Sequence, residues 1–218
     1  MIKAQSILYR YKDLSMFFNF QVEKGEKVSI LGPNGSGKST LLNLIAGFFR
    51  PNKGKILINN FDYTYASPSF RPISIVFQNN NLFSHLTVLQ NISLGVSYNL
   101  RLSVKNKRIV DEIIDIIDLN EQKNKFPNQI SGGQKQLVAL ARCLIRKKPI
   151  MLLDEPFSSI DCNSKRKILK VLNRFCQKDG ITLLIVLHDM KDASKMTNRS
   201  IILKNGSIIY DGKHKQFH

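Results

Sequence analysis

The most informative segment of the chain is Gly32-Pro33-Asn34-Gly35-Ser36-Gly37-Lys38-Ser39. It fits the pattern G-x-x-x-x-G-K-[ST], and it lies between a predicted buried strand, Lys27 to Leu31, and a predicted buried helix, Ser39 to Ala46. Glycines let the backbone wrap closely, so that several amide N–H groups converge on phosphate oxygens at the positive end of a helix. The segment therefore predicts a site for nucleotide phosphates. Lys38 would reach the β- and γ-phosphates, and the Ser39 hydroxyl would ligate Mg²⁺.

A second chemical signal stands at the end of an apolar run. Residues 150–153 read as a buried strand, and two carboxylates, Asp154 and Glu155, follow directly. Ligands of open α/β sheets bind outside the carboxyl ends of the strands. We therefore expect Asp154 to hold Mg²⁺, directly or through water, and Glu155 to polarise an attacking water molecule.

A third signal is Ile130-Ser131-Gly132-Gly133-Gln134, which precedes a helical pattern. The apolar residues of that helix recur at helical spacing on one face: Leu137, Leu140, Ala141, Leu144 and Ile145. Ser-Gly-Gly at a helix N-terminus forms an anion-binding nest, and the economical occupant is the nucleotide of a partner subunit. A simple helix cap by Ser131 is the alternative, but it accounts for the serine and not for the paired glycines.

The order of the remaining elements predicts the fold class. Further strands are expected at 16–22, 56–58, 73–77 and 181–187, and Asn205-Gly206 predicts a type I′ hairpin. Helical periods fill about 85–148, and another helix is expected around 165–175. Strand and helix alternate at both ends around a helical insertion, so the pattern predicts a largely parallel α/β core with a helical lobe.

Taken together, these residues resemble the ATP-binding-cassette (ABC) ATPases over essentially the whole chain. The marks of that family stand in order: Tyr11, residues 32–39, Gln78, Ser131 to Gln134, Asp154-Glu155, Ser158-Ser159-Ile160-Asp161 and His188. The resemblance implies a P-loop NTPase with a RecA-like parallel sheet core, an antiparallel β edge and an inserted α-helical subdomain. We expect one domain over 1–218, with a catalytic core at about 1–84 and 145–218. The helical subdomain, at about 85–144, would carry the family's signature segment, Ser131 to Gln134.

The resemblance also implies a role for each site residue. Four residues are expected to be catalytic: Lys38, Gln78, Glu155 and His188, the last as a γ-phosphate contact. Three are expected to serve Mg²⁺: Ser39, Gln78 and Asp154. ATP binding falls to Tyr11, Gly32, Pro33, Asn34, Gly35, Ser36, Gly37, Lys38, Ser39, Thr40, Ser131, Gly132, Gly133, Gln134 and Asp161. Tyr11 would stack on adenine, with Tyr9 as the alternative, and Asp161 would reach across a dimer.

Family resemblance implies the partners as well. We expect a homodimer of ATPase subunits bound to an integral membrane permease, and through it to a periplasmic substrate-binding protein, at the cytoplasmic face of a bacterial inner membrane. Residues 71–88 and 41–49 are similar to the ATPases of bacterial thiamine importers. Import of another small solute (an inorganic anion, a polyamine or iron) is the alternative, and a non-transport ABC ATPase acting on nucleic acid is a remote one.

Composition alone is less decisive than these motifs. The 218 residues carry a net charge of +17, which is compatible with nucleic acid, an anionic membrane surface or a basic exterior. Arg166, Lys170 and Arg174 form a basic stripe on the helix expected around 165–175, but no aromatic residues interleave with it to stack bases. We therefore expect no nucleic-acid partner. The three cysteines lack CxxC spacing, so neither a disulfide scaffold nor a zinc site is expected.

Overall fold

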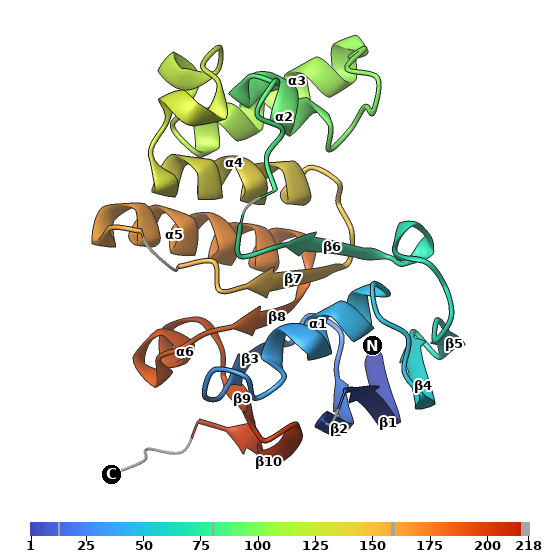
Figure 1. Cartoon of the computed structure of the whole chain (residues 1–218). Helices are drawn as coiled ribbons and strands as arrows, with labels where there is room; N and C mark the ends of the chain where they lie inside the picture. Colours follow the sequence, from blue (N-terminus) through green and yellow to red (C-terminus); the bar gives the residue numbers. More distant parts are fainter. Residues whose placement is uncertain (13, 80, 158–159, 215–218) are drawn as a thin grey trace. The chain divides into compact units, whose positions relative to one another are not determined.

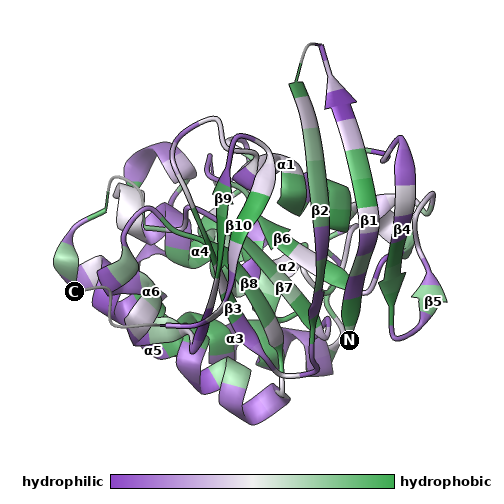
Figure 2. Cartoon of the chain, turned by 90° about the horizontal axis from the view of Figure 1, so that it is seen from below, coloured by the Kyte–Doolittle hydropathy of each residue, from purple (hydrophilic) through white to green (hydrophobic). Residues whose placement is uncertain are grey.

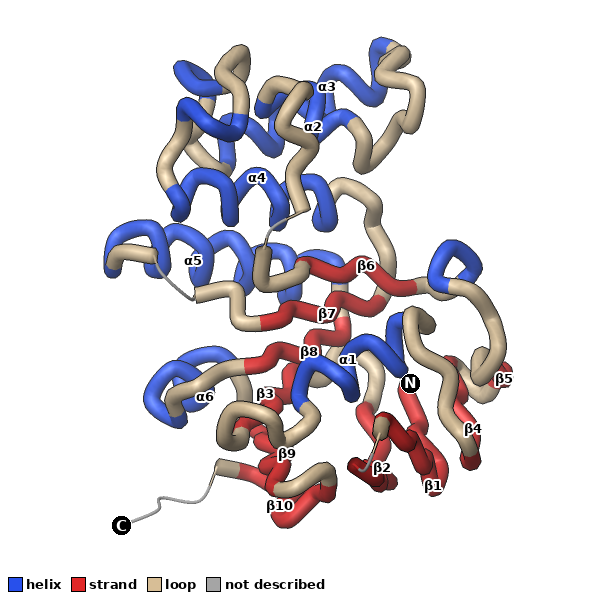
Figure 3. Tube along the Cα trace, viewed as in Figure 1, coloured by secondary structure: helices blue, strands red, loops and turns tan. Residues whose placement is uncertain are grey.

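The computed structural model describes residues 1–12, 14–79, 81–157 and 160–214, which form two compact units. The first unit comprises Met1–Ile75, Pro149–Glu155 and Gly180–His218, and the second comprises Val76–Lys148 and Pro156–Asp179. Strands dominate the first unit and helices the second (Figure 3). The predicted division into a catalytic core and a helical subdomain with its own boundaries stays a prediction.

The strands build one sheet (Figure 1). In chain order they are β1 (Ile2–Tyr11), β2 (Leu14–Val22), β3 (Lys27–Leu31), β4 (Lys53–Ile58), β5 (Phe61–Asp62), β6 (Ile73–Val76), β7 (Ile150–Asp154), β8 (Thr182–Val186), β9 (Arg199–Lys204) and β10 (Ser207–Lys213). Across the sheet their order is β5-β4-β1-β2-β10-β9-β3-β8-β7-β6. Strands β9, β3, β8 and β7 pair in parallel, whereas β5, β4, β1 and β2 pair antiparallel. The predicted parallel core with an antiparallel β edge is confirmed.

Each unit has its own helices. In the first unit they are α1 (Lys38–Ala46) and α6 (Met190–Met196). In the second unit they are α2 (Val88–Ser93), α3 (Val104–Ile116), α4 (Gly132–Leu144) and α5 (Cys162–Asp179). Short 3-10 helices lie at Pro68–Phe70, Asn120–Gln122 and Pro127–Gln129. No helix in the described ranges is both long enough and apolar enough to cross a bilayer.

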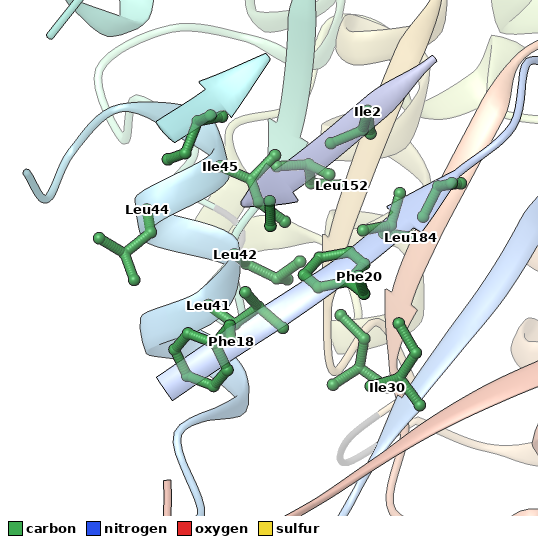
Figure 4. Packing of buried hydrophobic residues seen from close by; sticks show 14 of the residues in the cluster. Ile2, Phe18, Phe20, Ile30, Leu41, Leu42, Leu44, Ile45, Leu152 and Leu184 are labelled. Carbon is green, nitrogen blue, oxygen red and sulfur yellow. The ribbon is translucent and has the colours of Figure 1, made fainter. Parts of the chain in front are cut away.

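The hydrophobic core of the first unit lies between α1 and the sheet. Phe18 and Phe20 of β2 pack in one buried cluster with Leu41 and Leu42 of α1 (Figure 4). Alternation along β2 buries every second residue from Met16 to Val22, as the sequence predicted. Strands β7 and β8 are buried at every position, which explains their continuous apolar runs.

Strand β1 was missed by the sequence analysis, and a β-bulge explains why. The register with β2 shifts between Ala4 and Ile7, and Ser6 has a φ of 47°. The buried positions are therefore Ile2, Ala4 and Ile7, which breaks the two-residue period on which strand prediction depends. The interrupted alternation is visible along β1 in Figure 2.

At the C-terminal end of the first unit, His214 joins a buried hydroxyl cluster. Its Nε2 lies 2.9 Å from Thr197 Oγ1, and Ser200 Oγ lies 3.1 Å from its Nδ1. Ser200 Oγ in turn lies 2.6 Å from Ser29 Oγ on β3. The sequence offered no role for His214, and the structure gives it one in holding the residues just after β10 to β9 and, through Ser200, to β3.

Arg71 fastens the C-terminal end of α1 to the segment that leads into β6. Its guanidinium donates to four backbone carbonyls: Leu44 and Ile45 of α1 at 3.0 and 2.7 Å, Ala66 at 3.1 Å and Thr64 at 3.3 Å. The residue is 1% exposed, and burial lowers the pKa of Arg71 to about 10, so the side chain is still cationic at neutral pH. A cation at the helix C-terminus complements the partial negative charge of the carbonyls there.

Replacing Arg71 with methionine is expected to lower the free energy of unfolding by about 2–4 kcal/mol, because buried carbonyls lose their donor. Urea denaturation followed by circular dichroism measures this change. The matched control is Arg50→Met at an exposed position shortly after α1, which should change the free energy of unfolding by less than about 0.5 kcal/mol. Equal effects of the two substitutions would contradict the role of Arg71.

Candidate functional site

The phosphate loop joins β3 to α1, as predicted (Figure 1). Gly32, Gly35 and Gly37 have positive φ angles of 146°, 77° and 101°. A Cβ atom on Gly32 would lie 2.2 Å from the Leu203 carbonyl oxygen, so only glycine fits where the loop passes β9. Gly37 precedes α1 without a capping side chain, which leaves the first-turn amides of the helix to be satisfied by another group.

Lys38 lies inside this loop. Its Nζ donates to the carbonyl oxygens of Gly32 at 2.9 Å and Pro33 at 3.1 Å, and the residue is 5% exposed. Ser36 Oγ is also buried and finds no hydrogen-bond partner among the described residues. A buried cation and an unsatisfied hydroxyl in one loop fit an anionic, oxygen-rich ligand such as a nucleotide phosphate.

Ser39 and Asp154 bring α1 and β7 together. Ser39 Oγ donates to Asp154 Oδ1 at 3.1 Å, although the two residues are 115 positions apart in the chain. Burial is the main cause that raises the pKa of Asp154; the hydrogen bond from Ser39 opposes it, and the charge of Glu155 adds to it. Asp154 is thus a desolvated carboxylate beside the Ser39 hydroxyl and near the Lys38 ammonium.

These two oxygens fit Mg²⁺ better than they fit a metal bound by protein alone. Across the described residues there is no group of three or more His, Cys, Asp or Glu side chains that could hold an ion. Magnesium in nucleotide sites is held by one or two protein oxygens together with substrate phosphates and water. Ser39 and Asp154 match that donor set, whereas a protein cage for zinc or calcium does not form among these residues.

Glu155 and His188 meet at the ends of adjacent strands. His188 Nε2 lies 2.7 Å from Glu155 Oε2, with the carboxylate side chain 11% exposed and the imidazole 51% exposed. Parallel pairing of β7 with β8, which aligns Asp154 with Val186, carries both residues to the same edge of the sheet. Glu155 has a φ of 49°, an uncommon backbone conformation for a non-glycine residue and one that is concentrated at functional sites.

The two candidate tyrosines near the N-terminus differ in their surroundings. The ring of Tyr9 stacks on that of Phe49, with centroids 5.5 Å apart and planes 3° from parallel. Tyr11 is 59% exposed, and Lys12 Nζ lies 5.8 Å from its ring centroid. Tyr11 therefore presents more open ring surface than Tyr9 does.

In the second unit, Ser131 begins α4 as predicted. Its Oγ accepts from the Gln134 amide at 3.2 Å, and Gln134 Oε1 accepts from the Ser131 amide at 2.9 Å, which completes a capping box. All five apolar residues assigned to one face of this helix, from Leu137 to Ile145, are buried. The local structure of the signature segment is confirmed.

The structure supplies a packing reason for Gly133 that the sequence did not reveal. A Cβ atom there would lie 2.3 Å from Ser164 Oγ and 2.5 Å from Ser164 Cβ, at the start of α5. Ser164 is held in place by Asp161, whose Oδ2 accepts from Ser164 Oγ at 2.6 Å and whose Oδ1 accepts from the Asn163 and Ser164 amides. These hydrogen bonds, that of the Ser164 hydroxyl first, lower the pKa of Asp161. Asp161 thus caps α5 whatever further role it has.

Gln78, Ser158 and Ser159 are further positions that the sequence pointed to. Gln78 is exposed in the second unit, shortly after β6. Ser158 and Ser159 lie outside the described residues, as does His218, to which the sequence assigned no role. Asn91 and Arg142, whose side chains bind backbone groups of the second unit, were not predicted from the sequence. The available signal was a polar residue inside an apolar helical stretch.

Comparison with known proteins points to one family. The model of the family described as "ABC transporter" matches residues 16–158. The chain is 46% identical to the "Thiamine import ATP-binding protein ThiQ" of Photorhabdus laumondii over 212 residues, which cover 97% of this chain and 90% of that protein. The protein of the same name from Escherichia coli O6:H1 is 46% identical over 213 residues, with coverages of 98% and 92%.

Solved structures agree with this result. The chain is similar to the ATP-binding cassette MJ0796 in a dimeric post-hydrolysis state bound to ADP and Pi, with a TM-score of 0.87, 33% identity and full coverage of both chains. The ADP conformation of the cassette MJ1267 gives a TM-score of 0.84 at 25% identity, with 98% of this chain and 91% of that chain covered.

The close approach at Gly133 generates a prediction. Gly133→Ala is expected to lower the free energy of unfolding by about 1–3 kcal/mol, because the start of α4 or of α5 must shift to admit the methyl group. Ser164→Gly removes the atoms that the methyl group meets. The double variant should therefore be less destabilised than the sum of the two single variants, as measured in a urea double-mutant cycle. Strict additivity would contradict the packing explanation.

Proposed function

The chain belongs to the ABC transporter family, and from that premise we propose that it is the ATP-hydrolysing subunit that energises a bacterial importer of thiamine and its phosphates. The similarity to thiamine import ATP-binding proteins over 97% of the chain carries the proposal. The arrangement of Lys38, Ser39, Asp154, Glu155 and His188 supports the hydrolytic part.

ATP binding begins at the phosphate loop. The amides of the loop and of the first turn of α1 would bind phosphate oxygens, and Lys38 would turn its ammonium from the Gly32 and Pro33 carbonyls toward the β- and γ-phosphates. Ser39 and Asp154 would hold Mg²⁺, which when bound neutralises charge on the phosphates. This preorganised positive environment provides the larger part of the catalysis.

Glu155 would serve as the residue that polarises the attacking water. The water oxygen forms a bond to the γ-phosphorus while its proton passes to the Glu155 carboxylate, and the bond to the bridging oxygen breaks to give ADP and phosphate. His188 Nε2, 2.7 Å from Glu155 Oε2, would hold the carboxylate in one direction, and the imidazole would also contact the γ-phosphate.

The second half of the site would come from a partner subunit. We propose that Ser131, Gly132, Gly133 and Gln134 of one subunit bind the nucleotide held by the other, and that Asp161 reaches across the dimer. The similar cassette MJ0796 is dimeric, which supports the presence of a partner subunit in this proposal. Gln78 would sense Mg²⁺ and the attacking water, and closure and reopening of the dimer would provide the mechanical output.

Adenine would stack on Tyr11 rather than on Tyr9. The 59% exposure of Tyr11 supports this choice, since the ring of Tyr9 already stacks on Phe49. A membrane permease would dock on the segment after Gln78, with the periplasmic binding protein engaged only through that permease. These contacts would place the chain at the cytoplasmic face of the bacterial inner membrane.

The role of Glu155 leads to a direct test. Glu155→Gln should lower the rate of ATP hydrolysis by roughly 10²-fold or more, because the amide cannot accept the proton of the attacking water. ATP binding should persist, and size-exclusion chromatography with ATP and Mg²⁺ should show a trapped dimer. Glu121→Gln, an exposed control in the second unit, should hydrolyse ATP at the wild-type rate. Wild-type turnover by Glu155→Gln would disprove the assignment.

The transported substrate is tested in the cell. Deleting the gene for this chain should abolish high-affinity uptake of labelled thiamine, and the wild-type gene on a plasmid should restore it. The Glu155→Gln variant on the same plasmid should not restore uptake, since a trapped dimer cannot cycle. Unchanged thiamine uptake in the deletion strain would sink the thiamine proposal and leave the ATPase assignment to the hydrolysis assay.

A further inference from the structure

Asn91 of α2 clamps the segment 81–87 from one side. The residue is fully buried, and its Oδ1 accepts from the Phe83 amide at 2.9 Å. Its Nδ2 donates to the carbonyls of Phe83, Leu86 and Thr87 at 3.0, 3.0 and 3.1 Å. One buried amide side chain therefore ties three residues of the segment to a helix, at a position where an unsatisfied polar group would be costly.

Arg142 of α4 holds the start of the same segment. Its Nη2 donates to the Asn81 carbonyl at 2.9 Å, and its guanidinium carbon lies 5.8 Å from the centre of the Phe83 ring. A planar guanidinium can donate in its plane and cover an aromatic ring with its face at the same time. This hydrogen bond thus joins α4 to a segment that lies 61 positions earlier in the chain.

Helices α2 and α4 are themselves in close contact. At Gly95, just after α2, a Cβ atom would lie 2.5 Å from the Arg142 carbonyl oxygen and 2.5 Å from Ile145 Cγ1. Packing this tight at the last turn of α4 leaves little room for the two helices to slide past each other. Segment 81–87, α2 and the end of α4 are therefore joined by direct contacts.

The other end of α4 carries the signature segment. Arg142 lies ten residues after Gly132, which corresponds to about 15 Å along the axis of an α-helix. The capping box of Ser131 and Gln134 and the contact of Gly133 with α5 hold that end. A displacement of segment 81–87 would therefore reach the signature segment through a single helix.

We propose that Asn91 of α2 and Arg142 of α4 are positioning residues that hold segment 81–87 against these two helices. A permease docked on this segment would then move the signature segment at the other end of α4 with it. The proposal rests on the proposed function for the identity of the partner, a membrane permease. Phe83, with 47% of its surface exposed, presents to that partner the ring on which Arg142 also rests.

The first experiment uses the full chain alone. Arg142→Lys keeps the charge but replaces the planar fork with a single ammonium, which cannot serve both Asn81 and Phe83. Hydrogen–deuterium exchange of the amides in 81–87 should become at least about 10-fold faster. Arg146→Lys, an exposed control one turn further along the chain, should leave this exchange unchanged.

The second experiment uses the complex with the permease in liposomes. In Arg142→Lys the ratio of permease-stimulated to basal ATP hydrolysis should fall about 5-fold or more, while basal hydrolysis and its KM for ATP stay within about 2-fold of wild type. A merely structural defect would instead lower the basal rate. Unchanged exchange and an unchanged ratio would overturn the proposal, as would equal effects of Arg146→Lys.

A third variant, Phe83→Leu, tests the same contact from the other side, in case Arg142→Lys misfolds. Phe83→Leu removes the ring beneath the guanidinium at a partly exposed position and should also lower the ratio. In the Phe83→Leu background, Arg142→Lys should have a smaller further effect, since part of its contact is already lost. If the permease fails to stimulate even the wild-type chain, the proposed partner is wrong. The hydrogen–deuterium exchange measurement then decides whether Arg142 holds segment 81–87.

Discussion

Parallel pairing of β3, β8 and β7 is the constraint on which the site of the first unit depends. The registers align Val28 with Leu184 and Leu152 with Leu184, so the three strands end at one edge of the sheet. The phosphate loop follows β3 directly, Asp154 ends β7 with Glu155 next in the chain, and His188 comes two residues after the end of β8. Residues more than 100 positions apart therefore meet at hydrogen-bond distance, as in the contact of Ser39 with Asp154.

Helix α1 shows how the core and the site stabilise each other. Its N-terminal end faces the phosphate loop, and its C-terminal carbonyls are bound by Arg71. Leu41, Leu42, Leu44 and Ile45 are buried between these ends. The helix is thus held by apolar packing along its length and by a cation at its C-terminus, so the amides at its N-terminus can stay directed at a ligand.

In the second unit, the paired glycines at the start of α4 have two physical explanations that do not exclude each other. Paired glycines at the start of α4 suit an anion-binding nest, and Gly133 also allows the close approach of Ser164. Likewise, Asp161 caps α5 and is expected to reach a partner subunit. Measurements of both stability and hydrolysis on the same variants therefore separate packing from binding at these residues.

Local sequence patterns are enough to predict the phosphate loop, the strand that ends in Asp154-Glu155, the Asn205-Gly206 hairpin and the capped helix from Ser131, because each depends on local geometry and hydrophobic period. The sequence also showed that the +17 charge is a weaker clue than the motifs. The bulged strand β1, the hydrogen-bonding roles of Arg71, Asn91, Arg142 and His214, and the open ring of Tyr11 follow from the tertiary structure alone. These depend on which backbone groups and side chains distant in sequence come together, and no local pattern encodes that.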